Sequence, residues 1–256
     1  MQSILIELAE EPGLWIPQDP ASDTIVADGY VVVTWGKRAT VERIRLSADA
    51  VPAALELTRA LPGQDRVTWW VGEHSTPAGL AEQLLAAGLE PDAEAPELTS
   101  LTIASRPAGE PAVEVLHVST FEEYLRAMEL DWEVWDLPAD VRETRRAKVA
   151  EHWQMIVADG RVSHYLALVD GEPAGFGRVV FTPWAGILMG GATLPAARGR
   201  GVYTSLVHAR WNEAVERGTP RITVSAGAMS APILKRLGFA VIGKVRLLVD
   251  RLESRP

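Results

Sequence analysis

Short apolar runs separated by turn residues dominate the second half of the chain and predict a series of strands. The runs are rich in β-branched and aromatic residues, which suit a pleated and half-buried surface. The predicted strands span residues 113–118, 163–169, 174–181, 187–194, 221–226 and 244–250. Asp170 and Gly171 separate two of these runs, and this pair is typical of a tight turn between antiparallel strands.

Helical spacing of apolar residues predicts two helices between the first two of these strands. Either Ser119 with Glu122 or Thr120 with Glu123 is a capping box that begins the first helix. The second helix is predicted to begin at Asp140, beyond a break at Leu137-Pro138. This half of the chain is therefore predicted to combine a sheet with several helices.

The first half of the chain repeats part of this pattern. Its predicted strands span residues 24–35, 40–46, 67–72 and 98–104, and its predicted helices span 49–60 and 75–89. From 67 to 104 a strand, a Ser-x-Pro helix, a glycine-apolar cap and a strand follow one another, as they do from 222 to 250. A segment rich in proline and glycine at 106–111 predicts a domain boundary.

A basic turn with two glycines follows the predicted strand 187–194 and opens into an amphipathic helix. Gly199 and Gly201 allow the backbone a sharp turn and a close approach to a ligand. The free N–H groups of the first helical turn, the helix dipole and the cations of Arg198 and Arg200 all favour an anion. The pattern predicts a pyrophosphate site, and the sequence has no Walker loop that would indicate another nucleotide fold.

From Arg198 through Gly201 the chain resembles R-x-x-G-x-[GA], the coenzyme A pyrophosphate loop of the GNAT superfamily of N-acetyltransferases. A strand, a short helix ending in Leu-Gly-Phe at 237–239 and a final strand follow, in the order of the GNAT core. The resemblance covers residues 113–250. It implies an α/β class fold, the GNAT acyl-CoA N-acyltransferase fold, which is built on a mixed α+β sheet.

Together with the internal repeat, the resemblance implies two tandem GNAT-like domains. Residues 111–256 are the expected catalytic acetyltransferase domain. Residues 1–108 are the expected degenerate copy, which has no Arg/Gly loop. This copy is expected to be non-catalytic, to bind no coenzyme A, and to serve in packing or in shaping the substrate site.

The resemblance also implies which residues contact acetyl-CoA. In the family, the strand before the phosphate loop splays from its neighbour and pairs with the pantetheine arm. Gly190 and Gly191 lie where such a splay would begin, although two glycines in a strand are equally typical of a bulge. The expected coenzyme A residues are Ala192, Thr193, Leu194, Arg198, Gly199, Arg200, Gly201, Val202, Tyr203 and Thr204.

The acceptor amine is expected beside residues 130–137, because the connection between the first two helices borders the acceptor site in GNAT enzymes. The expected substrate residues are Asp131, Trp132, Trp135 and Asp136. Glu133 is the expected general base, acting through water. The alternative interpretation is that the tryptophans pack in the core and that the carboxylates are simply solvated.

Three positions depart from the family pattern. Tyr203 replaces the small final residue of the loop, Leu234 stands at the position of the usual general-acid tyrosine, and Gly227 stands where asparagine is common. Tyr203 is expected either to protonate the leaving thiolate or to be a structural residue. The general acid is thus left open by the sequence.

Composition limits the other classes of function. With no cysteine among 256 residues, thiolate catalysis, disulfides and cysteine metal sites are excluded, and the five histidines lack metal-ligand spacing. Residues 1–110 hold 7 Lys+Arg against 17 Asp+Glu, the rest holds 18 against 17, and the net charge is −9, which does not favour a nucleic-acid partner. The acidic start and the lack of a long apolar run favour a cytoplasmic protein without a signal peptide or a membrane partner.

The sequence therefore predicts an N-acetyltransferase that moves an acetyl group from acetyl-CoA directly to the amine of a small molecule or to an α-amine, without a metal. The alternative is a non-catalytic acyl-CoA binding or regulatory module, which Leu234 and the silent first half favour. Both a monomer and a homodimer are compatible with the sequence.

Overall fold

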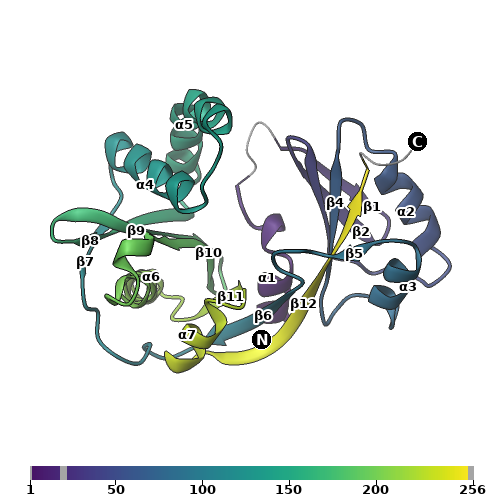
Figure 1. Cartoon of the computed structure of the whole chain (residues 1–256). Coiled ribbons are helices and arrows are strands. Elements are labelled where there is room, and N and C mark those ends of the chain that lie inside the picture. The colour runs from purple at the N-terminus through teal and green to yellow at the C-terminus, as the bar shows by residue number, and fades with distance from the viewer. Residues whose placement is uncertain (1, 18–21, 253–256) are drawn as a thin grey trace. The chain divides into compact units, whose positions relative to one another are not determined.

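The computed structural model describes residues 2–17 and 22–252 and divides the chain into two compact units, whose elements are shown in Figure 1. The first unit contains the residues up to Leu101, Ser225–Pro232 and the residues from Val241 onward. The second contains Thr102–Val224 and Ile233–Ala240. The last strand thus belongs to the first unit, whereas the predicted boundary at 108–111 assigns it to the catalytic domain. That boundary divides the chain by function and stays a prediction.

The strands of the second unit lie in the order β7-β8-β9-β10-β11. Their bounds are Glu114–His117 for β7, Val162–Val169 for β8, Glu172–Phe181 for β9, Gly186–Thr193 for β10 and Ile222–Ala226 for β11. Pairing is antiparallel except between β10 and β11, which run parallel. Asp170 and Gly171 take positive φ angles of 54° and 85° between β8 and β9, which confirms the predicted hairpin.

Two helices, α4 (Phe121–Val134) and α5 (Ala139–Asp159), cover one face of this sheet, and α6 (Val202–Glu216) covers the other (Figure 1). The N-terminus of α4 confirms the second predicted capping box. Glu123 N–H donates to Thr120 Oγ1 at 3.2 Å, and Thr120 N–H donates back to the Glu123 carboxylate at 3.0 Å. The predicted start of α5 at Asp140 is off by one residue.

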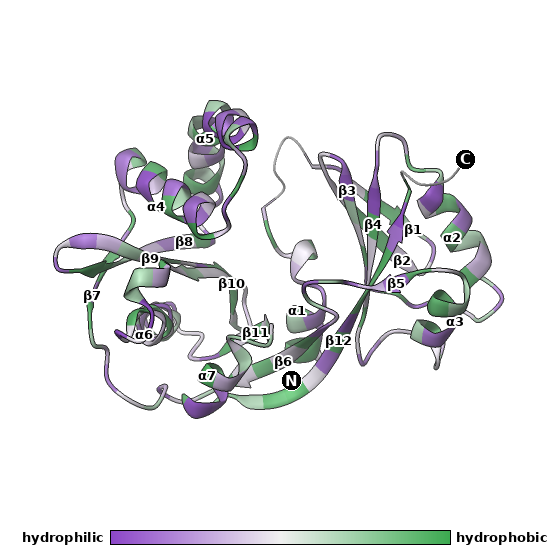
Figure 2. Ribbon diagram, in the orientation of Figure 1, coloured by the Kyte–Doolittle hydropathy of each residue, from purple (hydrophilic) through white to green (hydrophobic). Residues whose placement is uncertain are grey.

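Apolar side chains fill the space between the sheet and the helices α4 and α5. Tyr124, Ala127 and Leu130 of α4 pack with Leu166 of β8 and Phe176 of β9. Figure 2 shows hydrophobic residues along β9 and β10 and hydrophilic residues over much of α4 and α5. Burial of this apolar face fixes the helix whose last turn carries the predicted acceptor residues.

The first unit has the strand order β1-β2-β3-β4-β12. Its elements are α1 (Gln2–Glu10), β1 (Thr24–Ala27), β2 (Tyr30–Trp35), β3 (Arg38–Glu42), α2 (Val51–Arg59), β4 (Arg66–Val71), α3 (Leu80–Ala86), β5 (Glu90–Pro91), β6 (Glu97–Ile103) and β12 (Ala240–Arg251). From β1 to β4 the pairing is antiparallel, antiparallel and parallel, as it is from β8 to β11. The first unit therefore repeats the core topology of the second.

Two helices of the repeat also end alike. Just after α3, Gly88 has a φ of 92° and Leu89 N–H donates to the Leu84 carbonyl at 3.1 Å. After α7 (Ala231–Arg236), Gly238 has a φ of 97° and Phe239 N–H donates to the carbonyl of Leu234 at 3.1 Å. Both are glycine-terminated caps of the same type, which supports the predicted internal repeat.

The strand β12 completes the sheet of the first unit. Its residues Arg246–Arg251 pair antiparallel with β4, and Leu248, which is 1% exposed, packs in one core with Trp69. The predicted strand 24–35 is instead two strands joined at 28–29, and the predicted helix 75–89 begins only at Leu80. Helix α1 and the short strand β5 were not predicted.

Candidate functional site

The turn before α6 has the backbone that an anion site requires. A short 3-10 turn, Pro195–Ala197, leads into Gly199 and Gly201, which have φ angles of 79° and 80°. Only glycine adopts such angles without strain. The N–H groups of Gly199, Gly201, Val202 and Thr204 donate to no acceptor within residues 2–17 and 22–252. Free donors and the positive end of the helix dipole therefore meet at this turn.

The two predicted cations of the turn differ in their partners. Arg200 pairs with Asp170 at 2.9 Å, and this ion pair is exposed and lowers the pKa of Asp170. Arg198 is exposed and forms no ion pair or side-chain hydrogen bond with the described part of the chain. Of the two arginines, Arg198 is thus the one whose charge is uncommitted.

The strand β10 separates from β11 before it reaches this turn. The two strands pair only at Gly186 with Ile222 and at Ile187 with Thr223, whereas β10 continues to Thr193. The separation starts earlier than predicted, and Gly190 (φ 67°) instead lies in a bulge on the β9 side, between Met189 and Gly191. The splay and the bulge are therefore both present: β10 separates from β11 after Ile187, and the bulge follows at Gly190.

Strand alternation decides which groups of β10 face the separated edge. The N–H of Leu194 donates to the carbonyl of Ala174, at 2.9 Å and on the β9 side. In an antiparallel ladder the main-chain groups of successive residues point to opposite neighbours. The N–H and C=O of Thr193 therefore point toward the edge that β11 has left. Among the three expected pantetheine residues, Thr193 has the most suitable main chain.

Tyr203 packs against β10, where a glycine leaves room for its ring. A Cβ atom placed on Gly191 would lie 3.3 Å from Cε2 of Tyr203. The ring of Tyr203 therefore fits against β10 because Gly191 has no side chain. Leu234, at the position of the usual general acid, is fully buried and has no ionisable proton to donate. The roles of Tyr203 as acid or as structural residue stay predictions.

A buried arginine of α6 holds the bulge in place. Arg210, 1% exposed, donates from Nη1 to the carbonyls of Gly190 (3.4 Å) and Arg178 (3.3 Å) and from Nε to the carbonyl of Leu206 (2.9 Å). Burial lowers its pKa. The absence of a side chain at Gly177, whose Cβ would lie 3.1 Å from Cζ, makes room for the guanidinium. Sequence reasoning missed this residue, although Arg210 lies four residues from both Leu206 and Ala214, on the buried face of α6.

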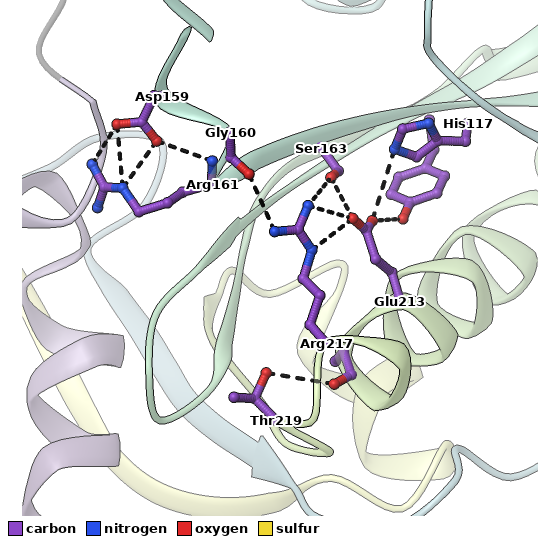
Figure 3. Close-up of polar contacts among 10 residues, drawn as sticks. His117, Asp159, Gly160, Arg161, Ser163, Glu213, Arg217 and Thr219 are labelled. Carbon is purple, nitrogen blue, oxygen red and sulfur yellow. Dashed lines mark hydrogen bonds and ion pairs between the residues drawn. The ribbon is translucent and has the colours of Figure 1, made fainter. Parts of the chain in front are cut away.

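The other end of α6 is tied to β8 by a polar cluster around Glu213, shown in Figure 3. Its carboxylate accepts hydrogen bonds from Ser163 Oγ at 2.7 Å, from the hydroxyl of Tyr165, and from Arg217 Nε at 2.8 Å. His117 lies 4.0 Å away. Burial and the Glu213 carboxylate raise the pKa of Tyr165. The cluster fixes the orientation of the helix whose first turn belongs to the candidate anion site.

The predicted acceptor residues lie in the last turn of α4 and just beyond it, and not in an open connection. Trp132 is 3% exposed and belongs to the core, while Glu133 is exposed and has no hydrogen bond or ion pair from its carboxylate among the residues described. Asp136 is also exposed, has a φ of 46°, and lies 3.9 Å from Arg142. Packing of Trp132 and solvation of the two carboxylates are compatible with the alternative interpretation, and the substrate and base roles of these three residues stay predictions.

Asp131 and Trp135 are brought together. Trp135 Nε1–H donates to Asp131 Oδ1 at 3.1 Å, and the carboxyl group is half-buried although the indole is exposed. Burial raises the pKa of Asp131, and the nearby charge of Arg178 partly opposes this shift. Of the predicted carboxylates, Asp131 has the surroundings of a general base.

Two neighbouring residues of the sheet, His164 and Arg178, face α4. His164 of β8 pairs in register with Arg178 of β9, which in turn pairs with Met189 of β10, directly before the bulge. Burial lowers the pKa of His164 to about 3, so this side chain is neutral and too weak a base to accept a proton near neutral pH. Arg178 was missed, although it alternates with Gly177 and so shares a face with Phe176.

Comparison with known proteins assigns this unit. Residues 122–239 match the family model described as the Acetyltransferase (GNAT) family. Residues 122–239, called the GNAT domain below, are similar to the domains of this family. The matched segment begins in α4, includes the turn 198–204 and ends just past α7. It contains α6 and the strands β8 to β11, whereas β7 with His117 lies before it.

The fold of the whole chain is also shared with solved structures. A GCN5-related N-acetyltransferase from Kribbella flavida is 18% identical, with a TM-score of 0.66 and coverage of 90% of each chain. A tandem GNAT protein from the clavulanic acid biosynthesis pathway is 15% identical, with a TM-score of 0.63, and the match covers 100% of this chain and 96% of that one. No curated protein sequence matches the chain. Two tandem GNAT-like folds are thus present.

Two further findings concern other classes of site. Within the described residues, no group of three or more histidine or carboxylate side chains could hold a metal ion. In the same residues, every helix is too short or too polar to cross a membrane.

Proposed function

We propose that the GNAT domain is an acetyl-CoA-dependent N-acetyltransferase that acts on the amine of a small molecule. The amine nitrogen attacks the thioester carbonyl, the new C–N bond forms and the C–S bond breaks. The amine loses its proton to a base, and the coenzyme A thiolate gains a proton from solvent or from Tyr203. The transfer is direct, without a covalent enzyme intermediate.

One observation carries this proposal: the turn 198–201 joins free N–H donors, two left-handed glycines and an uncommitted arginine at the start of α6. A pyrophosphate would accept hydrogen bonds from these donors and pair with Arg198. The edge of β10 at Thr193, from which β11 has separated, is the matching place for the pantetheine arm. Both parts of acetyl-CoA therefore have surfaces that fit them.

The base of the proposed reaction is better placed at Asp131 than at Glu133. Glu133 is exposed and lacks a partner that would orient it among the described residues, whereas Asp131 is half-buried and held by Trp135. A raised pKa moves a carboxylate toward the range in which it accepts a proton efficiently. The role of Glu133 as general base stays a prediction.

The first experiment is calorimetric titration with acetyl-CoA, together with release of free thiol in the presence of amines. We expect Arg198→Ala to weaken acetyl-CoA binding about tenfold, because one charge-assisted contact with phosphate is lost. Arg38→Ala removes another exposed arginine that has no ion pair among the described residues, in β3 of the first unit, and is the matched control. Equal affinities of the two variants would remove the turn from the proposal.

The same titration tests the second candidate function, a non-catalytic acyl-CoA binding module, which the buried Leu234 favours. Such a module would still bind acetyl-CoA through the turn 198–201, so Arg198→Ala would still weaken binding, but it would release no thiol with any amine. We also expect one acetyl-CoA per chain, because the Arg/Gly turn occurs once in the sequence. Two sites per chain would show that the first unit binds acetyl-CoA as well.

A further inference from the structure

We propose that Arg178 and Asp131 form the acceptor subsite, and that the acceptor amine therefore also carries a carboxylate, as an α-amino acid does. The inference rests on the proposed N-acetyltransferase function and names the class of its substrate. The carboxylate would pair with Arg178 and the ammonium group would lie at Asp131. The following observations support each half of this arrangement.

Arg178 is a cation without a partner. It projects from the middle of β9 toward α4, where Tyr124 and Asp131 are the groups that act on its charge. Its Nε is buried and donates no hydrogen bond, and its guanidinium forms no ion pair with any residue that the structure describes. The side chain as a whole is half-buried, so its outer N–H groups can be reached. Enclosing a cation without an acceptor is unfavourable, and a bound anion would offset that penalty.

Asp131 provides the opposite charge at the same place. Arg178 draws the pKa of Asp131 down and Asp131 draws that of Arg178 up, so each lies in the field of the other. Nevertheless, the two groups do not come within ion-pair distance, and Asp131 accepts a hydrogen bond only from Trp135 within the described chain. Two opposite charges that lie near enough to act on each other, without closing into an ion pair, match the two charged ends of an amino-acid zwitterion.

The position of Arg178 places this subsite next to the reacting thioester. Arg178 lies opposite Met189, the residue before the bulge of β10, and the proposed pantetheine edge begins beyond that bulge. On its other side, the neutral ring of His164 lies against Phe176, with centroids 5.8 Å apart, and adds no competing positive charge. A carboxylate held by Arg178 would hold the adjacent amine near Asp131, to which the amine transfers its proton before it attacks.

Matched amines test the inference directly. Thiol release from acetyl-CoA would be measured with phenylalanine, phenylalanine methyl ester and 2-phenylethylamine, and with tryptophan and tryptamine. We expect kcat/KM to be about 10- to 100-fold higher for each amino acid than for the amine that lacks the carboxylate, from one charge-assisted pair. Arg178→Gln should remove this preference, and Arg178→Lys should restore part of it. Arg126→Gln, at an exposed arginine of α4 paired with Glu172, is the control and should keep it.

The outcomes separate the inference from the function on which it rests. A wild-type protein that releases thiol equally well with phenylalanine and 2-phenylethylamine would overturn the inference and leave the acetyltransferase intact. A wild-type protein that binds acetyl-CoA but releases no thiol with any of these amines would count against both. The wild-type comparison decides the matter even where an Arg178 variant does not fold. For a folded Arg178→Gln, acetyl-CoA affinity should be unchanged, and loss of that affinity would show that Arg178 has a structural role instead.

Discussion

A buried carboxyl group in the first unit makes the stability of the protein dependent on pH. Glu42 of β3 is 1% exposed, and it accepts hydrogen bonds from Gly13 N–H at 3.1 Å and from Thr40 Oγ1 at 3.2 Å. Burial raises its pKa from 4.5 to about 8, and the neighbouring Glu11 adds to the shift. At pH 6 the folded protein therefore holds Glu42 protonated, whereas the unfolded chain exposes it as a carboxylate.

The sign of the effect follows from this difference. The folded state binds the proton more tightly, so the stabilisation is complete below pH 4.5 and is lost as pH rises through about 8. Each pH unit between these limits changes the free energy of unfolding by about 1.4 kcal/mol, which gives a loss of about 2 kcal/mol between pH 6 and pH 8. Glu11, whose pKa burial raises to about 7, contributes in the same direction over the lower part of the range.

Denaturant unfolding at pH 6 and pH 8 checks the magnitude. Glu42→Gln keeps the shape of the protonated acid and cannot ionise, so its loss of stability over this range should be about 2 kcal/mol smaller than that of the wild type, and Glu11 accounts for the loss that remains. Glu56→Gln, on the exposed side of α2, is the control and should behave as the wild type. If Glu42→Gln and the wild type lost the same stability, Glu42 would be ionised in the folded protein and the reasoning from burial would fail.

Three further predictions concern other parts of the chain. Leu248→Ala should cost about 3 kcal/mol of unfolding free energy by leaving a cavity in the core, while Val241→Ala, at a half-exposed position of the same strand, should cost well under 1 in the same denaturation assay. Gly201→Val should abolish the thermal shift given by coenzyme A, because a Cβ there lies 2.5 Å from that of Ala112 and the φ of 80° is unfavourable for valine; an unchanged shift would contradict this. Asp131→Asn should flatten the acidic limb of the pH-rate profile and Glu133→Gln should leave it intact, and the reverse result would return the base to Glu133.

The local features of the fold were predictable because a few neighbouring residues determine each of them. Asp170 and Gly171 alone specify a turn with two positive φ angles, and Thr120 with Glu123 specifies a helix start. Gly201 predicts the left-handed backbone of the turn before α6 in the same way. These signals need no knowledge of what lies across the molecule, and the structure confirms the geometry of each.

Features that depend on distant partners were not predictable in this way. The apolar pattern of residues 244–250 specifies a strand, but nothing in it indicates that the strand pairs with β4. Likewise, alternation along β9 places Arg178 on the α4 face, yet its lack of a partner is a property of everything packed around it. Asp131 and Glu133 are both carboxylic acids and lie two residues apart in the sequence. Only their different directions around the helix make Glu133 exposed and Asp131 half-buried.

The place of β12 also has a consequence for the order in which the chain is made. The strand β4 is complete once Val71 has left the ribosome, but its antiparallel partner lies at Arg246–Arg251. At a synthesis rate of about 5–20 residues per second, the edge of β4 remains without that partner for roughly ten seconds or more. An open edge beside the apolar residues Val67 and Trp69 is a template for pairing with other nascent chains. The first unit is therefore begun first and finished last, and a chain that stops before residue 246 lacks the strand that pairs with β4 in its N-terminal sheet.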